Sequence, residues 1–126
     1  MKCKNISLLT FMILMAMAGL CRADVVQDTL SDAKKQGKIV MIEVEAAGCA
    51  GCDEMEPVID KLRTDYKDKL EVLYIDAKRD MEYARRFLVR AIPTQIFIDK
   101  NGKEFRRHIG FYSYEEIASV LKKKGL

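Results

Sequence analysis

Two cysteines three positions apart, Cys49 and Cys52, are the pair in this sequence best suited to chemistry. The apolar, β-branched run at residues 39–44 predicts a strand, and after the cysteines apolar residues recur at steps of three and four, which predicts a helix. The pair therefore lies at a strand-to-helix junction, with Cys49 at the cap and Cys52 one turn further in. Amides and the dipole at a helix start stabilise a thiolate on the outer sulfur. This placement indicates a redox-active pair that opens and closes a small disulfide ring.

Other uses of the cysteine pair remain open on these residues alone. One is a purely structural disulfide, although a bridge that closes so short a loop constrains the unfolded chain little. Another is a copper-binding module or copper chaperone, because the stretch from Gly48 to Cys52 also resembles the loop in which small heavy-metal-associated domains bind a soft ion through two thiolates. Those domains place methionine two residues before the first cysteine, where this chain has Ala47. Zinc usually takes four ligands, and only His108 could supplement the two thiols.

The other predicted elements alternate along the chain. Periodicity and capping signals predict helices over residues 24–36, 49–68 and 80–89 and from residue 113 onward, and strands over residues 39–45, 70–75, 95–98 and 103–109. Pro57 lies inside the second helix and should kink it. Asn101-Gly102 predicts a hairpin, so the last strand returns antiparallel beside the third. Ser113 and Glu116 form a capping-box pattern. This order predicts an α/β domain, with two parallel strands joined by crossover helices and then a hairpin edge.

The first 23 residues are predicted to be a secretory signal peptide. Lys2 and Lys4 precede an almost uninterrupted apolar stretch at residues 6–20, and Ala23 ends an acceptable cleavage site. The apolar stretch is shorter than the roughly 20 residues that a membrane-spanning helix needs. The alternatives are an uncleaved membrane anchor and a lipoprotein acylated at Cys21. We expect an exported protein, in the periplasm or another extracytoplasmic compartment, that touches a membrane only through this segment if it stays uncleaved.

The charge of the chain points away from nucleic acid. The whole sequence has 22 basic and 19 acidic residues, but three of the basic ones and none of the acidic ones lie in residues 1–23, so residues 24–126 are formally neutral. A nucleic-acid-binding domain needs a clustered basic face, which this composition does not indicate. Residues 24–126 have the length of a single domain with one modest core. Two of the four cysteines remain in it, in a compartment where a disulfide can persist.

The order of elements resembles that of the thioredoxin family. The resemblance rests on Cys-x-x-Cys at the exit of the first strand, on Ile92-Pro93-Thr94 opening the third, and on Pro57, residues 72–76 and residues 100–103 at matching spacings. It covers residues 24–126 and implies a single thioredoxin-like α/β domain with a central mixed four-stranded sheet flanked by helices. It further implies a thiol–disulfide oxidoreductase without bound cofactor or metal, which exchanges disulfides with protein substrates. We expect a monomer that receives electrons from a redox partner protein.

The resemblance also implies residue roles. Cys49 corresponds to the nucleophile that attacks a substrate disulfide, and Cys52 to the resolving thiol that releases the reduced substrate. Pro93 corresponds to the cis-proline that faces the cysteines, and Ile92 before it to the residue whose backbone binds an extended substrate segment. Glu43 lies where the family often keeps a buried acid beneath the resolving cysteine. An acid inside an apolar strand has a raised pKa, which suits proton transfer, although a strand can also direct it toward a solvated rim.

Three departures from the family pattern concern partner choice and redox direction. Gly48, which we also assign to the substrate-binding face, stands where the family usually has tryptophan, and the chain contains no tryptophan at all. The dipeptide Ala50-Gly51 is neither the Gly-Pro of thioredoxins nor the Pro-His of strongly oxidising relatives. Val72 replaces the lysine that often accompanies the buried acid.

The charges that follow the cysteines favour a reducing or isomerase-supporting role. Asp53, Glu54 and Glu56 crowd the first turns after Cys52. Negative charge disfavours the thiolate, whereas the strongest oxidants of this superfamily depend on a very low thiolate pKa. Ile92 before the proline also matches thioredoxin-type reductants.

Overall fold

The computed structural model describes residues 25–126, and the predicted signal segment lies outside them. The helices are α2 (Val25–Lys35), α3 (Ala50–Asp53), α4 (Glu56–Asp65), α5 (Met81–Arg86) and α6 (Tyr114–Lys123), and the strands are β1 (Ile39–Glu45), β2 (Leu70–Asp76), β3 (Thr94–Ile98) and β4 (Glu104–Ile109). Within this described part, no helix is long and apolar enough to span a bilayer.

The four strands form one mixed sheet in the order β2-β1-β3-β4. β1 pairs with β2 in parallel and with β3 in antiparallel fashion, and β4 is the antiparallel edge beside β3. The predicted α/β architecture, a central mixed four-stranded sheet flanked by helices, is confirmed. Its two inner strands are covered on both faces, which is why β1 is nearly continuous in apolar residues.

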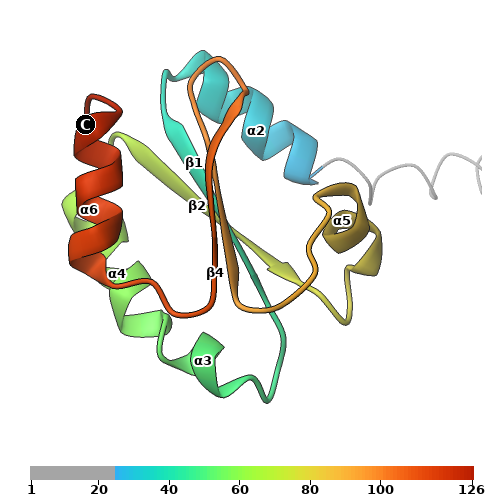
Figure 1. Cartoon of the computed structure of the whole chain (residues 1–126). Coiled ribbons are helices and arrows are strands. Elements are labelled where there is room, and N and C mark those ends of the chain that lie inside the picture. The colour runs from blue at the N-terminus through green and yellow to red at the C-terminus, as the bar shows by residue number, and fades with distance from the viewer. Residues whose placement is uncertain (1–24) are drawn as a thin grey trace, which may run out of the picture.

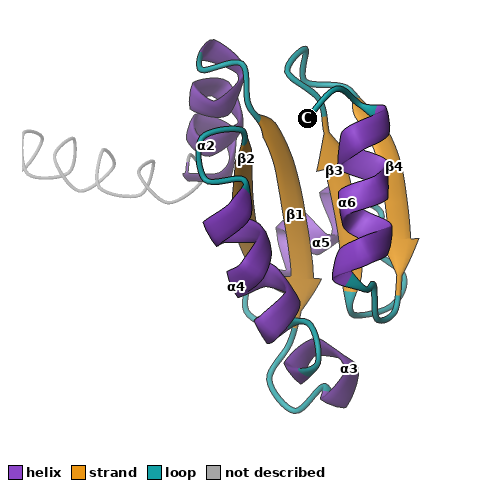
Figure 2. Ribbon diagram, turned by 90° about the vertical axis from the view of Figure 1, so that its left-hand side faces the viewer, coloured by secondary structure: helices purple, strands orange, loops and turns teal. Residues whose placement is uncertain are grey.

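Helices cover both faces of this sheet (Figure 1). α4 and α6 lie on one face, and α2 and α5 lie on the other. Alternate residues of β1 supply the two cores: Met41 packs with Ile59 and Leu121 beneath α4 and α6, and Ile42 packs with Ile75 on the opposite face. Figure 2 shows α3 beyond the carboxyl end of β1, outside both helical layers. The sheet therefore delivers the cysteine segment to one exposed end of the molecule.

The predicted single helix over residues 49–68 is wrong in its continuity. The structure has the one-turn helix α3, a turn at Glu54 and Met55, and then α4. Pro57 lies in the first turn of α4, where a missing amide hydrogen costs little because the first amides of a helix have no partner within that helix. Proline at this position therefore starts a new helix and does not kink an existing one.

Two predictions from local signals are confirmed. Ser113 caps α6 with the complete capping box, its side chain paired with the amide of Glu116 and the Glu116 carboxylate with the amide of Ser113. The antiparallel return of β4 is also as expected, but its loop is longer than the Asn-Gly pair alone predicts. The carboxylate of Asp99 accepts hydrogen bonds from the amides of Asn101 and Lys103 (3.0 and 3.1 Å), which organises the wider turn.

Candidate functional site

Cys49 and Cys52 form a disulfide across the single turn of α3, with their Cα atoms 5.2 Å apart. Cys49 occupies the N-cap position and is half-buried, whereas Cys52 is 3% exposed. The carbonyl of Cys49 accepts hydrogen bonds from the amides of Cys52 and Asp53 (3.0 and 3.2 Å), so the turn is closed by the backbone. The outer sulfur is therefore the one that a large substrate can reach.

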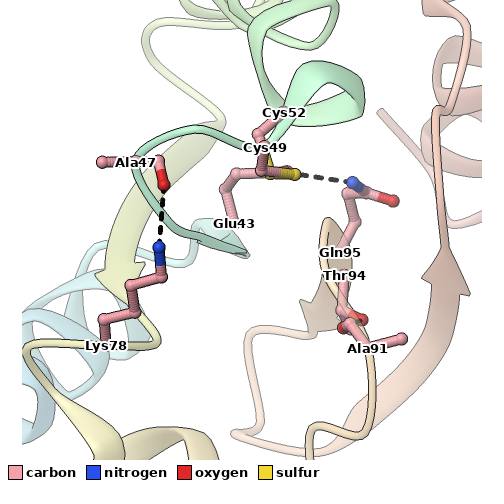
Figure 3. Close-up of a disulfide and its surroundings, with 8 residues drawn as sticks. All are labelled: Glu43, Ala47, Cys49, Cys52, Lys78, Ala91, Thr94 and Gln95. Carbon is pink, nitrogen blue, oxygen red and sulfur yellow. Dashed lines mark hydrogen bonds between the residues drawn. A yellow bond between two sulfur atoms is a disulfide. The ribbon is translucent and has the colours of Figure 1, made fainter.

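The segment that leads from β1 to Cys49 is a tight turn held from outside. Gly48 has a φ of 80°, in the left-handed region that glycine adopts without strain, and is exposed. The ammonium of Lys78, after β2, donates a hydrogen bond of 3.0 Å to the carbonyl of Ala47 (Figure 3). This backbone geometry gives a physical reason why a bulky residue such as tryptophan does not occupy position 48 in this chain.

The predicted proline site lies directly against the cysteine turn. The Ile92–Pro93 bond is cis, as predicted. A Cβ atom placed on Gly51 would lie 3.4 Å from Cδ of Pro93, so the proline ring packs beside the middle of the Cys-x-x-Cys segment. The carbonyl of Pro93 accepts a hydrogen bond from the amide of Gly110 (2.8 Å). Within residues 25–126, the amide and carbonyl of Ile92 make no hydrogen bond, which leaves both for a bound chain.

Glu43 lies fully buried on the sheet face beneath α4 and α6, so the solvated-rim position is ruled out. Its Oε1 accepts a hydrogen bond of 3.1 Å from Nε2 of Gln95. Burial raises the pKa of Glu43 to about 8; the Gln95 bond lowers the pKa and the nearby Glu45 raises it, both by less. Figure 3 shows the Glu43 side chain extending from β1 toward the disulfide loop.

A polar row crosses the sheet at the level of Glu43. The strand register places Tyr74 of β2 and Gln95 of β3 on either side of Glu43, and His108 of β4 beside Gln95. Gln95 is fully buried, and no role for it was predicted from the sequence. A glutamine in an otherwise apolar strand was the available signal, but its partner became evident only once the antiparallel register was known.

His108 takes the ordinary structural role that its place in the hairpin predicts. Its ring stacks on Tyr112 with centroids 3.9 Å apart, and its Nε2 lies 2.9 Å from the carbonyl oxygen of Phe111. Among residues 25–126, no three His, Cys, Asp or Glu side chains are grouped as metal ligands, so His108 does not join the two cysteines in such a group.

Acidic side chains gather at the carboxyl end of β1. The pKa of Glu45 is raised, first by burial and then by the charges of Glu56, Asp76 and Asp53. Two of these, Asp53 and Glu56, belong to the acidic run that the sequence places after Cys52. The cysteine turn thus stands in a negative environment, and its one-turn helix offers a shorter dipole than the long helix expected from the sequence.

Known proteins share this arrangement. The family model described as "Thioredoxin-like domain" matches residues 26–125. The thioredoxin of Staphylococcus aureus is 31% identical over 98 residues, which are 78% of this chain and 93% of the relative. Thioredoxin NaTrxh from Nicotiana alata has a TM-score of 0.69 and 30% identity, with 79% of this chain and 85% of that chain covered. The germline-specific thioredoxin Deadhead from Drosophila melanogaster has a TM-score of 0.66 and 25% identity, with 78% and 92% covered.

Proposed function

Because this chain belongs to the thioredoxin-like family and is a thiol–disulfide oxidoreductase that acts on protein disulfides, we propose that it is an exported member with a reducing or isomerase-supporting role. The observation that carries the division of roles between the two cysteines is their unequal exposure beside Pro93: Cys49 is half-buried and Cys52 is almost wholly buried. The first sulfur meets the substrate, and the second completes the reaction out of reach of other thiols.

The reaction begins with the reduced pair. The thiolate of Cys49 attacks one sulfur of a substrate disulfide, forms a mixed disulfide and expels the other substrate sulfur as a thiolate. Cys52 then loses its proton and attacks the sulfur of Cys49. The Cys49–Cys52 bond forms, the bond to substrate breaks, and the second substrate thiolate leaves and takes up a proton from solvent. Two electrons pass from the cysteine pair to the substrate.

Glu43 is the proposed acceptor of the Cys52 proton. A general base works best when its pKa lies near that of the group it deprotonates, and a thiol has a pKa of about 8.5. Burial raises the pKa of Glu43 to about 8, which matches this requirement. The carboxyl lies on β1, the strand whose carboxyl end leads into the cysteine turn, and can exchange the proton directly or through a water molecule.

The substrate surface is proposed to consist of Gly48, Ile92 and Pro93. Gly48 is exposed beside Cys49 and carries no side chain to cover the sulfur. Among the described residues, none bonds to the amide or the carbonyl of Ile92, which precedes the proline that packs on the cysteine turn. An extended segment of a protein substrate can therefore pair with the Ile92 backbone while its cysteine faces Cys49.

The reducing direction is supported by charge. The acidic groups around the carboxyl end of β1 and the first turns after Cys52 oppose a thiolate on Cys49, and only one helical turn favours it. A less stabilised thiolate makes the reduced form a stronger electron donor. In an extracytoplasmic compartment, the oxidised protein must be reduced again by a partner protein. We expect that partner to reduce the Cys49–Cys52 disulfide through the proposed substrate surface.

Export is supported by the sequence of residues 1–23, in which Lys2 and Lys4 precede an apolar stretch and a small-residue cleavage site. The experiment for this part is fractionation of cells that produce the full chain. We expect the protein outside the cytoplasm and shorter by about 23 residues, as measured by mass spectrometry of the N-terminus. Intact protein in the cytoplasmic fraction overturns the localisation.

Redox direction is tested by equilibrating the purified protein with glutathione buffers of known poise. We expect a reduction potential near the thioredoxin value of about −270 mV, and a value more positive than about −150 mV makes the protein a disulfide-forming oxidase. A parallel titration of the reduced protein with copper(I) tests the alternative use of the same two thiols. Tight copper binding without disulfide exchange identifies a metal-binding module in place of the reductant.

A further inference from the structure

The pair formed by Glu43 and Gln95 has no exposure to solvent. The two residues are directly opposed on β1 and β3, and each side chain is 0% exposed. Nε2 of Gln95 donates the 3.1 Å hydrogen bond to Oε1 of Glu43. Within the described chain, this is the only hydrogen bond that the Glu43 carboxyl makes. Among the described residues, the Gln95 amide is therefore the group whose hydrogen bond offsets part of the rise in the Glu43 pKa that burial causes.

Each partner also keeps one buried oxygen that accepts no hydrogen bond from any residue of the described range 25–126. These atoms are Oε2 of Glu43 and Oε1 of Gln95. A carboxyl oxygen is a donor when it is protonated and an acceptor when it is ionised, whereas an amide oxygen is an acceptor only. An amide supplies a donor for the carboxylate and an acceptor for the carboxylic acid. A glutamine can thus serve both protonation states of its partner, whereas an apolar residue serves neither.

The other polar and charged groups near Glu43 lie on its own strand and along the polar row. Tyr74 faces Glu43 from β2, and the Arg63 guanidinium from α4 lies 4.8 Å from the centroid of the Tyr74 ring. Glu45 follows on the same strand and raises the pKa of Glu43. His108 on β4 is occupied by Tyr112 and Phe111. The apolar side chains that fill the core on this face are contributed chiefly by α4 and α6, among them Met55, Ile59 and Ile117.

We propose that Gln95 is a positioning residue for proton transfer: its amide holds the Glu43 carboxyl in one orientation through both protonation states, so that Glu43 takes the proton from Cys52 in the step that releases substrate. This inference rests on the proposed role of Glu43. In that step the Cys52 S–H bond breaks, the proton moves to Glu43, the Cys52–Cys49 bond forms, and the Cys49–substrate bond breaks with departure of a substrate thiolate. Glu43 later returns its proton to solvent.

The test compares Gln95→Met, Glu43→Gln and the double variant with the unaltered protein. Methionine keeps an unbranched side chain of similar length and removes both the donor and the acceptor. Reduced protein is mixed with excess peptide disulfide and quenched in acid at intervals. Mass spectrometry then gives the rate at which the mixed disulfide forms and the rate at which it resolves, from pH 5 to pH 10. A ¹³C NMR titration of the Glu43 carboxyl gives its pKa directly in proteins that retain Glu43.

For Gln95→Met we expect the pKa of Glu43 to rise by about one pH unit or more, because a hydrogen bond to a charged group is lost. The pH midpoint of the resolving step should rise equally, so that the mixed disulfide lives about tenfold longer at pH 7. Its rate of formation by Cys49 should stay unchanged. In the Glu43→Gln background, adding Gln95→Met should shift nothing further, because the titrating partner is already absent.

The possible outcomes distinguish the role of Glu43 from that of Gln95. If Glu43→Gln leaves the pH profile of the resolving step unchanged, both the role of Glu43 and that of Gln95 are overturned. If Glu43→Gln changes the profile but Gln95→Met moves neither the profile nor the Glu43 pKa, only the role of Gln95 is overturned. If Gln95→Met slows both steps equally at every pH and does so again in the Glu43→Gln background, Gln95 is a packing residue.

Two further variants keep the test decisive. Ile96→Val shortens the neighbouring fully buried residue, whose side chain packs in the opposite core with Ile42 and Ile75. It should leave both rates and their pH dependence unchanged, which controls for general loosening of β3. Gln95→Leu replaces Gln95→Met if circular dichroism shows that the methionine variant does not fold.

Discussion

The side chain of Lys78 is bonded to the backbone of Ala47, 31 residues earlier in the chain, at 3.0 Å. Lys78 lies in the loop after β2, which is itself held by Asp76, whose Oδ1 accepts hydrogen bonds from the amides of Lys78 and Arg79 (2.9 and 3.0 Å). These two bonds, the Arg79 amide first, lower the pKa of Asp76. The loop after the second strand thus fixes the turn through which the first strand reaches Cys49.

Lys78→Met should loosen the approach to Cys49 without unfolding the protein. The bond is exposed, so its loss costs about 0.5 kcal/mol, near the lower limit for an intramolecular hydrogen bond. We expect the amides of residues 46–48 to exchange with deuterium roughly two- to threefold faster. The measurement is hydrogen exchange with mass spectrometry, with the exposed Lys67→Met as the matched control. Unchanged exchange in this segment contradicts a holding role for Lys78.

The two cysteines should differ when each is replaced. Cys49→Ser removes the reachable sulfur, so disulfide exchange should fall to the uncatalysed rate. Cys52→Ser leaves Cys49 able to attack but removes the sulfur that resolves the intermediate, so a mixed disulfide with substrate should accumulate. Non-reducing electrophoresis and mass spectrometry after incubation with a disulfide-bonded protein measure both effects. Accumulation in Cys49→Ser and none in Cys52→Ser reverses the assigned roles.

Glu43 should make the oxidised protein less stable as the pH rises. Its carboxyl has a pKa of about 8 when folded and a reference value of 4.5. Between these values the folded state holds a proton that the unfolded state releases, so the free energy of unfolding falls as the pH increases. Glu43→Gln removes this dependence and should be more stable than the unaltered protein by on the order of 4 kcal/mol at pH 9, with little difference at pH 4.

Urea unfolding of the two oxidised proteins at pH 4, 7 and 9 measures this difference. The contribution of Glu43 appears as the part of the pH dependence that Glu43→Gln lacks. The exposed Glu115→Gln is the control for loss of one carboxylate elsewhere. Parallel stability curves for Glu43→Gln and the unaltered protein contradict the raised pKa.

Two glycines in the cysteine loop should respond oppositely to alanine. Gly48 has a φ of 80°, where a side chain is strained, so Gly48→Ala should lower the free energy of unfolding by about 1 kcal/mol. Gly51 lies in α3 with a helical backbone, and an added Cβ reaches ordinary contact with Pro93. Gly51→Ala should raise the free energy of unfolding by about 0.5 kcal/mol, because alanine restricts the unfolded chain. Thermal unfolding of both variants measures the contrast, and equal shifts contradict it.

Local sequence signals predicted much of this fold. The capping pattern at Ser113, the antiparallel return after Asn101 and the strand before Cys49 each depend on neighbours within a few positions, and each was confirmed, although the turn at Asn101 is wider than predicted. The prediction at Pro57 was wrong because a proline within a helical apolar pattern fits either a kink in one helix or the start of a second helix. Only the tertiary position of α3 decides between the two.

The acid of the candidate site was predicted, but its partner was not. Glu43 was predicted from the family resemblance, as an acid inside the apolar strand that precedes Cys49, and this signal lies within one stretch of chain. Gln95 lies 52 residues from Glu43, and their contact depends on the register between β1 and β3. A shift of that register by one residue would turn Gln95 to the opposite face of the sheet, and nothing in either strand alone specifies which alignment forms.

The polar row from Tyr74 through Glu43 and Gln95 to His108 marks a boundary on the sheet between positions where substitutions have different effects. Below it, residues such as Met41 and Phe97 fill the core, and a substitution there alters how many copies of the protein survive in the cell. At the row and above it, a substitution also alters how each surviving copy handles protons and sulfur. In a library of variants scored once for abundance and once for exchange activity, the variants whose activity changes more than their abundance should therefore lie at this row and beyond it.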